Sequence, residues 1–259
     1  MEKKEFHRHY LPHFQQPGQA YFVTWSLKDA VPPKALQTYT QKLELLKSQI
    51  HSLGPANLLT QIFDSYSPII TQSNIDAKAT PTHKPVPKIS TTKFAGPLSP
   101  AIEELQKEYD AVRRKYIKAY DNLLDAERNP GVNLSKPDNR EVMMASLKFW
   151  EGKKLNNCAF TIMSNHIHWV FELFEKDQEG KPVYLQDILK SVKGFSAYRI
   201  NELENRPGSL WQKESFDTTI RTDVHLYHAI NYTLNNPVAA GLVTHWKLWP
   251  GSWYRSDDF

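Results

Sequence analysis

Two histidines, two positions apart, are the residues of this chain best suited to chemistry. They form the tripeptide His166-Ile167-His168 inside an apolar run that predicts a β-strand. Side chains two positions apart in a strand point to the same face, so both imidazoles can approach one metal ion. Imidazole binds several transition metals, and two such ligands leave positions for carboxylate, amide, water or phosphate oxygens. The alternative is a pair of histidines that line an ordinary strand face.

A tyrosine and an asparagine form a second candidate pair, in the segment DVHLYHAINYTLNNPV. Here Leu226, Ile230 and Leu234 recur every fourth residue, which predicts a helix with one apolar side. Tyr232 and Asn236 lie four positions apart on roughly the opposite side, one turn from each other. Both could therefore meet a metal site built on a sheet. The alternative is a partly exposed tyrosine beside an Asn-Pro turn that ends the helix.

Strands and helices must position these residues, and the sequence predicts most of them. We predict four strands, at 20–27, 158–163, 166–174 and within 207–221, and five helices, at 35–50, 100–128, 141–155, 185–204 and 223–236. Ser164-Asn165 predicts a tight hairpin between the middle strands, and Pro237 is expected to stop the last helix. This order indicates an α+β fold, with helices on one face of an antiparallel sheet.

The middle of the chain has the composition of an insertion. Residues 66–100 are rich in Ser, Thr, Pro and Lys and have few large apolar side chains. Such a segment buries too little surface to offset the entropy of ordering it, so we predict a low-complexity, partly disordered loop. We therefore expect one domain from residues 1–30 and 140–259, which holds both candidate pairs, and a helical insertion at 31–139.

Composition excludes several classes of protein. The single cysteine, Cys158, excludes an intrachain disulfide and a cysteine-based zinc site. No run of 18 apolar residues predicts a membrane span, and the N-terminus lacks the apolar core of a secretory signal, so we expect a cytoplasmic protein. The net charge of +4 is a weak sign of nucleic-acid binding, because residues 31–100 carry it, with seven Lys or Arg and three Asp or Glu.

Three motifs resemble those of the HUH-type single-tyrosine transposases, and most closely the REP-associated tyrosine transposases. They are MSNHIH (163–168), LWQKESFDTTIR (210–221) and YTLNNPVAAGLV (232–243), where the family typically has MPNHxH, LWQxxxxDxxIR and YIxxNPVxAGLV. The segments at 7–27 and 246–254 also resemble the ends of that pattern. This chain departs from the pattern at Ser164 and Thr233, where the family usually has proline and isoleucine, and neither position is a ligand.

The resemblance implies a ferredoxin-like HUH domain and a metal-dependent enzyme that cuts and rejoins single-stranded DNA near hairpin-forming repeats. It makes His166, His168 and Asn236 the ligands of Mg²⁺ or Mn²⁺, and Tyr232 the nucleophile. Attack by Tyr232 would give a 5′-phosphotyrosine link and a free 3′-OH. A free phenol has a pKa of about 10, and a nearby divalent cation favours the phenolate. Related enzymes include dimers and others that act alone, so a monomer and a homodimer both stay open.

Further residues are candidates for contact with DNA. Phosphate contacts are expected from cations near the motifs, although each could also be a solvated surface charge: Lys190, Lys193, Lys213 and Arg221. Arg8 and His13 are added by the resemblance alone. Tyr198 is a rival nucleophile or a platform on which a base could stack, and the alternative is a packing tyrosine among solvated charges.

Two other functions compete with this interpretation. A DNA-binding regulator could keep the fold without the reaction, in which case no covalent protein–DNA adduct would form. A metal phosphoesterase acting through water would release free 5′-phosphate ends and tolerate Tyr232→Phe.

Overall fold

The computed structural model describes residues 6–8, 12–14, 17–32, 34–53, 100–126, 131–213 and 215–255, the first two segments as backbone only. They divide into two compact units. One unit contains helices α1 (Gln37–Leu53) and α3 (Pro100–Asp125), and the other contains the main sheet and the remaining helices. The low-complexity loop predicted at 66–100 lies outside the described residues up to residue 99. The boundaries that we placed at 30 and 140 stay predictions.

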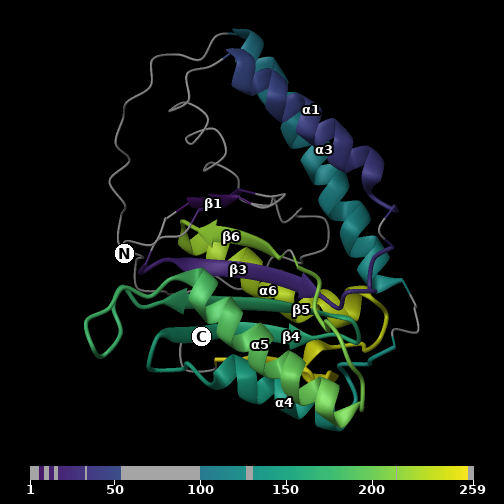
Figure 1. Ribbon diagram of the computed structural model, residues 1–259, viewed down its shortest axis with the longest axis vertical. Coiled ribbons are helices and arrows are strands. Elements are labelled where there is room, and N and C mark those ends of the chain that lie inside the picture. Colours follow the sequence, from purple (N-terminus) through teal and green to yellow (C-terminus); the bar gives the residue numbers. More distant parts are fainter. Residues whose placement is uncertain are drawn as a thin grey trace. The chain divides into compact units, whose positions relative to one another are not determined.

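The main sheet has five antiparallel strands in the order β6-β3-β5-β4-β7 (Figure 1). They are β6 (Phe216–Ile220), β3 (Ala20–Ser26), β5 (His166–Leu173), β4 (Leu155–Ile162) and β7 (Ser252–Tyr254). A separate two-stranded sheet pairs β1 (Phe6–Arg8) with β2 (Pro12–Phe14). The four predicted strands are confirmed, whereas β1, β2 and β7 are too short for their residue pattern to predict them.

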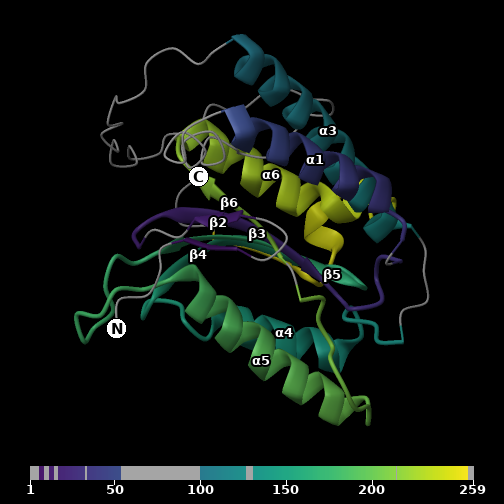
Figure 2. The ribbon, with the colours of Figure 1, turned by 45° about the horizontal axis from the view of Figure 1, so that its top comes forward.

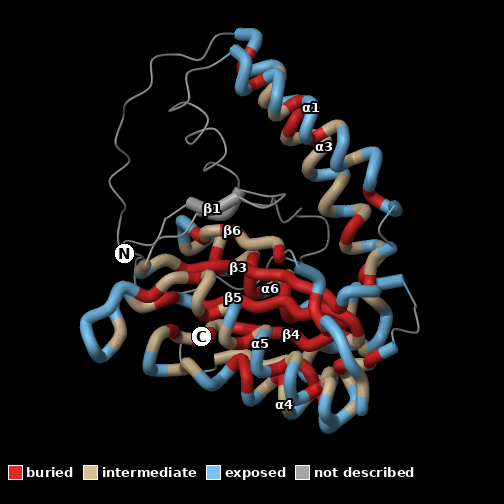
Figure 3. Tube along the Cα trace, in the orientation of Figure 1, coloured by how far each residue is buried: buried red, intermediate tan, exposed pale blue. Residues whose placement is uncertain are grey.

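Three helices cover the main sheet. Helices α4 (Pro137–Lys148) and α5 (Leu185–Leu203) lie on one face, and α6 (Asp223–Ala239) lies on the other (Figure 2). The α+β class and the antiparallel sheet are confirmed, but the expectation that the helices share one face is wrong. The physical reason lies in the central strands: all seven residues of β3 are buried, and a strand buried on both sides needs a cover on both sides (Figure 3).

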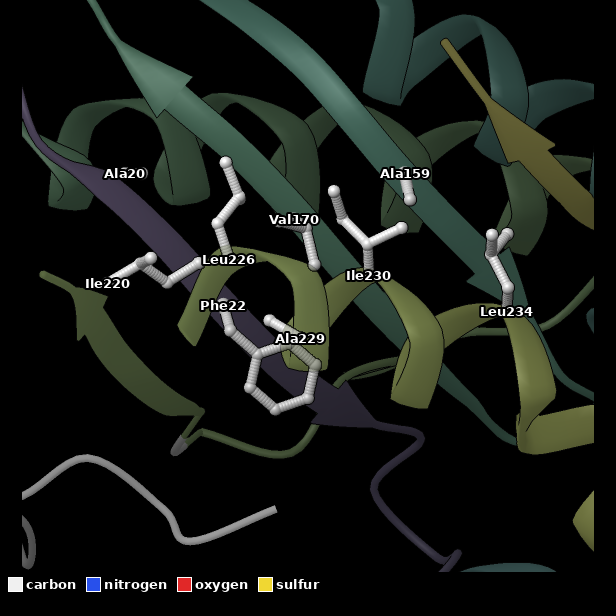
Figure 4. Packing of buried hydrophobic residues seen from close by; sticks show 9 residues of the cluster. All are labelled: Ala20, Phe22, Ala159, Val170, Ile220, Leu226, Ala229, Ile230 and Leu234. Carbon is white, nitrogen blue, oxygen red and sulfur yellow. The ribbon is translucent and has the colours of Figure 1, made fainter. Parts of the chain in front are cut away.

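The α6 face has a core of small and medium side chains. Leu226, Ala229, Ile230 and Leu234 of α6 pack on side chains from four strands, namely Ala20, Phe22, Ala159, Val170 and Ile220 (Figure 4). The apolar residues recur every three or four positions along the helix, so they form one stripe toward the sheet. This packing holds α6 against strands β6, β3, β5 and β4.

The other face of the sheet has a core of large aromatic rings. Trp25 contacts both Trp169 and Trp211 edge to face, with ring centroids 6.1 and 6.0 Å apart. The Trp211 indole N–H donates to the Ser196 hydroxyl of α5 at 3.2 Å. The Trp169 indole N–H donates to Asn157 at 2.6 Å, whose amide in turn donates to the Leu147 carbonyl of α4. These bonds attach both helices to this face.

Helix α6 ends just before Gly241 and not at its proline. We expected Pro237 to stop the helix, but the helix includes this residue and continues to Ala239. The last carbonyls are satisfied beyond it, because the N–H of Gly241 donates to Val238 and that of Leu242 donates to Pro237. Gly241 has φ +70°, the left-handed conformation that closes such a cap. The helix therefore continues one turn beyond Asn236.

The unit of α1 and α3 is a pair of helices with its own apolar core. The buried residues are Leu43, Leu46, Ile50, Ile102 and Tyr109. The Lys42 ammonium lies 2.8 Å from the Glu108 carboxylate across the pair. Among the described residues, no helix is long and apolar enough to cross a membrane.

Candidate metal and nucleophile site

The two predicted ligands come from the start of β5, next to a tight turn. Ser164-Asn165 joins β4 to β5, and the Met163 N–H donates to the His166 carbonyl at 2.9 Å, which confirms the predicted hairpin. His166 and His168 alternate with Ile167, so both side chains point to the α6 face. Their Nε2 atoms lie 3.1 Å apart. The spacing in the sequence thus brings the two imidazoles to one point.

Each imidazole is also held at its other nitrogen. The Nδ1 of His166 lies 2.7 Å from the side-chain oxygen of Asn165, and the Nδ1 of His168 lies 2.8 Å from the hydroxyl of Thr24 on β3. All four residues are buried. Histidine ligands of metals generally have such a partner at the far nitrogen, because it fixes the ring and its tautomer.

Both histidines are neutral at pH 7. Burial lowers the pKa of His166 to about 3, and an interaction with the Asn236 side chain offsets part of this shift. Burial also lowers the pKa of His168 well below its ordinary value, and the neighbouring His166 lowers it further. A neutral imidazole keeps a nitrogen lone pair free for a ligand bond.

Helix α6 brings the other predicted pair to the same place. The Tyr232 ring meets His168 edge to face with centroids 5.3 Å apart, and it meets Phe22 in the same way at 5.7 Å. Tyr232 is half-buried, whereas Asn236 is only 5% exposed. The Oδ1 of Asn236 is buried and makes no hydrogen bond of ordinary geometry among the described residues, although the side chain is close enough to His166 to raise its pKa.

This donor set fits a divalent cation. Two ligand atoms that bind one ion at about 2.1 Å lie roughly 3 Å apart when the angle at the ion is near 90°, as in octahedral coordination, and the two Nε2 atoms have this separation. An orphaned amide oxygen in a buried place costs free energy unless a donor or a cation reaches it. Within the described residues, no group of three or more His, Cys, Asp and Glu side chains could hold a metal, so a third protein ligand beside the two histidines would be of another kind, such as this amide.

A row of hydroxyl groups extends this polar region across the sheet. His168 lies between Thr24 of β3 and Thr161 of β4 in the register of the strands. The Thr161 hydroxyl lies 3.1 Å from that of Ser252 on β7. Sequence analysis missed Thr24, Asn165 and Thr161. One signal was present, because Thr24 interrupts the apolar strand AYFVTWS, but its contact with His168 spans 144 positions of the chain.

The candidate DNA contacts fall into separate places. Lys190 and Tyr198 are exposed on α5, and the Lys193 ammonium donates to the Gln212 carbonyl at 3.0 Å. Helix α5 covers the opposite face of the sheet from His168, so Tyr198 does not share a site with the histidines (Figure 2). Lys213 is exposed before β6.

Arg221 lies toward the other end of the strands from the two histidines, because its neighbour Ile220 pairs with Ala20, whereas His168 pairs with Thr24. It is exposed immediately before α6, and its charge contributes to lowering the pKa of His225, after burial and His228. Arg8 and His13 belong to β1 and β2, but their side chains lie outside the described residues. The roles of all these residues in DNA binding stay predictions.

Comparisons with known proteins were made with the sequence and with the fold. No family model matches the chain. A putative REP-associated tyrosine transposase of Haemophilus influenzae is 28% identical over 106 residues, which cover 38% of this chain and 58% of that protein. The match thus spans little more than half of the relative's length.

A solved structure of a REP-associated tyrosine transposase bound to a REP hairpin matches with a TM-score of 0.37 and 13% identity, over 97% of this chain and 82% of the other. The match with the Haemophilus influenzae protein rests on sequence alone, so it is independent of this structural comparison. The sequence match confirms the resemblance to a REP-associated tyrosine transposase that the three motifs predicted.

Proposed function

We propose that this chain cuts and rejoins single-stranded DNA near hairpin-forming repeats, with Tyr232 as the nucleophile and a divalent cation held by His166, His168 and Asn236. One observation carries the proposal: β5 and α6, which are far apart in the sequence, bring these four side chains together at one buried place. The curated relative that is named a REP-associated tyrosine transposase supports the same class of reaction.

The reaction exchanges one phosphodiester bond for another. The phenolic oxygen of Tyr232 attacks the scissile phosphorus, the bond to the 3′ oxygen breaks, and the DNA keeps a 5′-phosphotyrosine link. The phenol gives up its proton to solvent, and the 3′ oxygen takes up a proton and leaves as a free 3′-OH. A 3′-OH then attacks the phosphotyrosine and returns the tyrosine to its starting form. No nucleotide cofactor is needed, because the energy of the broken bond is kept in the covalent link.

The side chains around Tyr232 would have different roles in this reaction. Phe22 and His168 hold the ring of Tyr232 on two sides, so that it has few orientations. His166, His168 and Asn236 would hold the cation, with Mg²⁺ and Mn²⁺ as the expected ions. When bound, the cation supplies Lewis-acid polarisation of the phosphate and stabilises negative charge on oxygen.

A covalent-adduct assay tests this proposal. Purified protein is incubated with labelled hairpin DNA from repeats beside its own gene, with Mn²⁺ or with EDTA, and products are separated under denaturing conditions. We expect a shifted band with Mn²⁺ that is absent with EDTA and absent in Tyr232→Phe, which removes only the hydroxyl. Binding without any adduct across several repeats and metals would favour a non-catalytic regulator. Free 5′-phosphate ends made equally by Tyr232→Phe would favour a hydrolytic phosphoesterase.

A further inference from the structure

The outer nitrogens of the two histidines have partners of different chemical kinds. His166 Nδ1 faces the amide oxygen of Asn165, and His168 Nδ1 faces the hydroxyl of Thr24. An amide oxygen can only accept a hydrogen bond, whereas a hydroxyl can donate or accept. Asn165 is 2% exposed and Thr24 is 4% exposed, so bulk water does not replace either partner.

The partner of His166 determines where that ring carries its proton. Because Asn165 Oδ1 accepts, His166 must donate from Nδ1, and its Nε2 then carries a bare lone pair. Without a cation, a second bare lone pair on His168 Nε2 would repel it across 3.1 Å. The favourable arrangement places a proton on His168 Nε2, which donates to His166.

This leaves His168 Nδ1 as an acceptor, and the Thr24 hydroxyl donates to it. The buried groups thus form one continuous chain of hydrogen bonds when no cation is bound. Thr24 donates to His168, His168 donates to His166, and His166 donates to Asn165. Every hydrogen bond in this chain has one donor and one acceptor, as buried polar groups require.

A cation at this point needs a different arrangement at one residue only. Both Nε2 atoms must present lone pairs, and His166 already does so. His168 must lose its Nε2 proton and gain one at Nδ1, where the Thr24 hydroxyl then accepts it. The ring stays neutral and the two protons exchange with solvent, so no net proton is gained or lost.

We propose that Thr24 is a positioning residue whose hydroxyl lets His168 exchange tautomers when the cation binds, while Asn165 keeps His166 in its metal-ready tautomer throughout. This inference rests on the proposed role of the two histidines as ligands. It adds two residues beyond the proposed ligands and nucleophile, and it assigns them different tasks.

Histidine nitrogen NMR tests the tautomers directly. The full chain is labelled with ¹⁵N-histidine, and the signals are assigned with His166→Gln and His168→Gln, because the chain has ten histidines. Without metal, we expect the Nδ1–H form at His166 and the Nε2–H form at His168. With Zn²⁺ as a diamagnetic probe, we expect the Nδ1–H form at both. A His168 that is already Nδ1–H without metal, or a His166 that is Nε2–H, would overturn the inference.

Matched substitutions test the two positioning residues. Thr24→Val keeps the branched shape and removes the hydroxyl, and Thr24→Ser keeps the hydroxyl. Loss of a partner behind a metal ligand typically costs about 10–100-fold in metal affinity. We expect a loss of this size for Mn²⁺ in Thr24→Val, measured by electron paramagnetic resonance, and affinity within a few-fold of the wild type in Thr24→Ser.

Asn165 has its own matched pair. Asn165→Asp keeps an acceptor at Nδ1, and Asn165→Leu removes it at similar size. We expect only the leucine variant to show a mixture of His166 tautomers and weaker Mn²⁺ binding. These measurements use no DNA. A missing covalent adduct would therefore contradict the proposed function without changing the result expected for metal binding and the tautomers. Wild-type Mn²⁺ affinity in both Thr24→Val and Asn165→Leu would overturn the inference whether or not an adduct forms.

Discussion

The two faces of the five-stranded sheet bury different chemistry. On the face covered by α4 and α5, the fully buried side chains include the rings of Tyr21, Trp25, Trp169 and Phe171. On the face covered by α6, the buried residues toward one end of the strands are polar, namely Thr24, Thr161, His166 and His168. The first face gains stability from apolar area. The second keeps polar groups out of water, which is unfavourable unless each has a partner, and this is the place where we propose that a cation binds.

The comparison predicts that the aromatic face governs stability. Trp169 is fully buried, packs on Phe171 with ring centroids 3.9 Å apart and bonds to Asn157. Trp169→Ala is expected to lower the free energy of unfolding by about 3–5 kcal/mol, because it opens a cavity and leaves Asn157 without its donor. Urea unfolding measures this change. Phe195→Ala on helix α5, which covers the same face of the sheet, is the control, since Phe195 is 53% exposed. The free energy of unfolding of this variant should stay within about 0.5 kcal/mol of the wild-type value.

The α6 face is predicted to govern metal binding instead. His168→Asn removes a proposed ligand, and we expect Mn²⁺ affinity to fall by more than the roughly 10–100-fold that loss of a supporting partner costs. His168→Asn should lower the free energy of unfolding by less than Trp169→Ala does. The hydrogen bonds of a buried imidazole offset only part of the cost of removing it from water, so its loss costs less stability. Titration calorimetry and urea unfolding on the same preparations separate the two effects. A variant that unfolds as easily as Trp169→Ala yet binds Mn²⁺ normally would reverse the assignment of the two faces.

A close backbone approach at the edge of the sheet gives a third test. An added Cβ at Gly251 would lie 2.4 Å from the Ile162 carbonyl oxygen, and the Gly251 carbonyl accepts from the Ile162 N–H at 3.0 Å. Gly251→Ala should therefore displace β7 and lower the free energy of unfolding by about 1–3 kcal/mol. Gly131→Ala is a suitable control, because nothing lies within 4 Å of its added Cβ. Equal stability of the two variants would show that β7 adjusts without cost.

Acid should destabilise the fold through the α6 face. The folded pKa of His166 is lowered to about 3, whereas the unfolded value is near 6.5. As the pH falls below 6.5, the unfolded chain gains a proton that the folded chain does not, so stability present above pH 6.5 is lost down to about pH 3. At pH 5.5 this histidine alone should account for about 1 kcal/mol. Metal-free His166→Gln should lose correspondingly less between pH 7.5 and pH 5.5 in urea unfolding, and an unchanged slope would contradict the assignment.

The sequence predicted the parts of the fold that depend on local pattern. Helix α5 has clear periodicity, and β4 and β5 are apolar runs of strand length, so their predicted positions agree with the structure to within a few residues. The His166–His168 spacing and the Tyr232–Asn236 spacing each predicted one shared face, and both pairs do share one. What local pattern could not predict is which face each helix covers, because the mostly apolar run of β3 is compatible with a cover on one side or on both.

The parts that the sequence did not predict depend on partners far along the chain. Thr24 meets His168 only because β3 pairs with β5 in one register. Asn165 was assigned to a turn, and its side chain proved to serve the neighbouring histidine as well. Pro237 was expected to stop α6 because a proline removes one backbone donor, but the cap at Gly241 determines the end.

Mapping the modified tyrosine tests the central claim most directly. The adduct formed with hairpin DNA and Mn²⁺ is digested with nuclease and protease, and mass spectrometry locates the tyrosine that carries the nucleotide. We predict the nucleotide on Tyr232 in the wild type and in Tyr198→Phe, and no modified peptide in Tyr232→Phe. A nucleotide on Tyr198 would place the chemistry on the α5 face, on the opposite side of the sheet from the histidines, and would contradict the account.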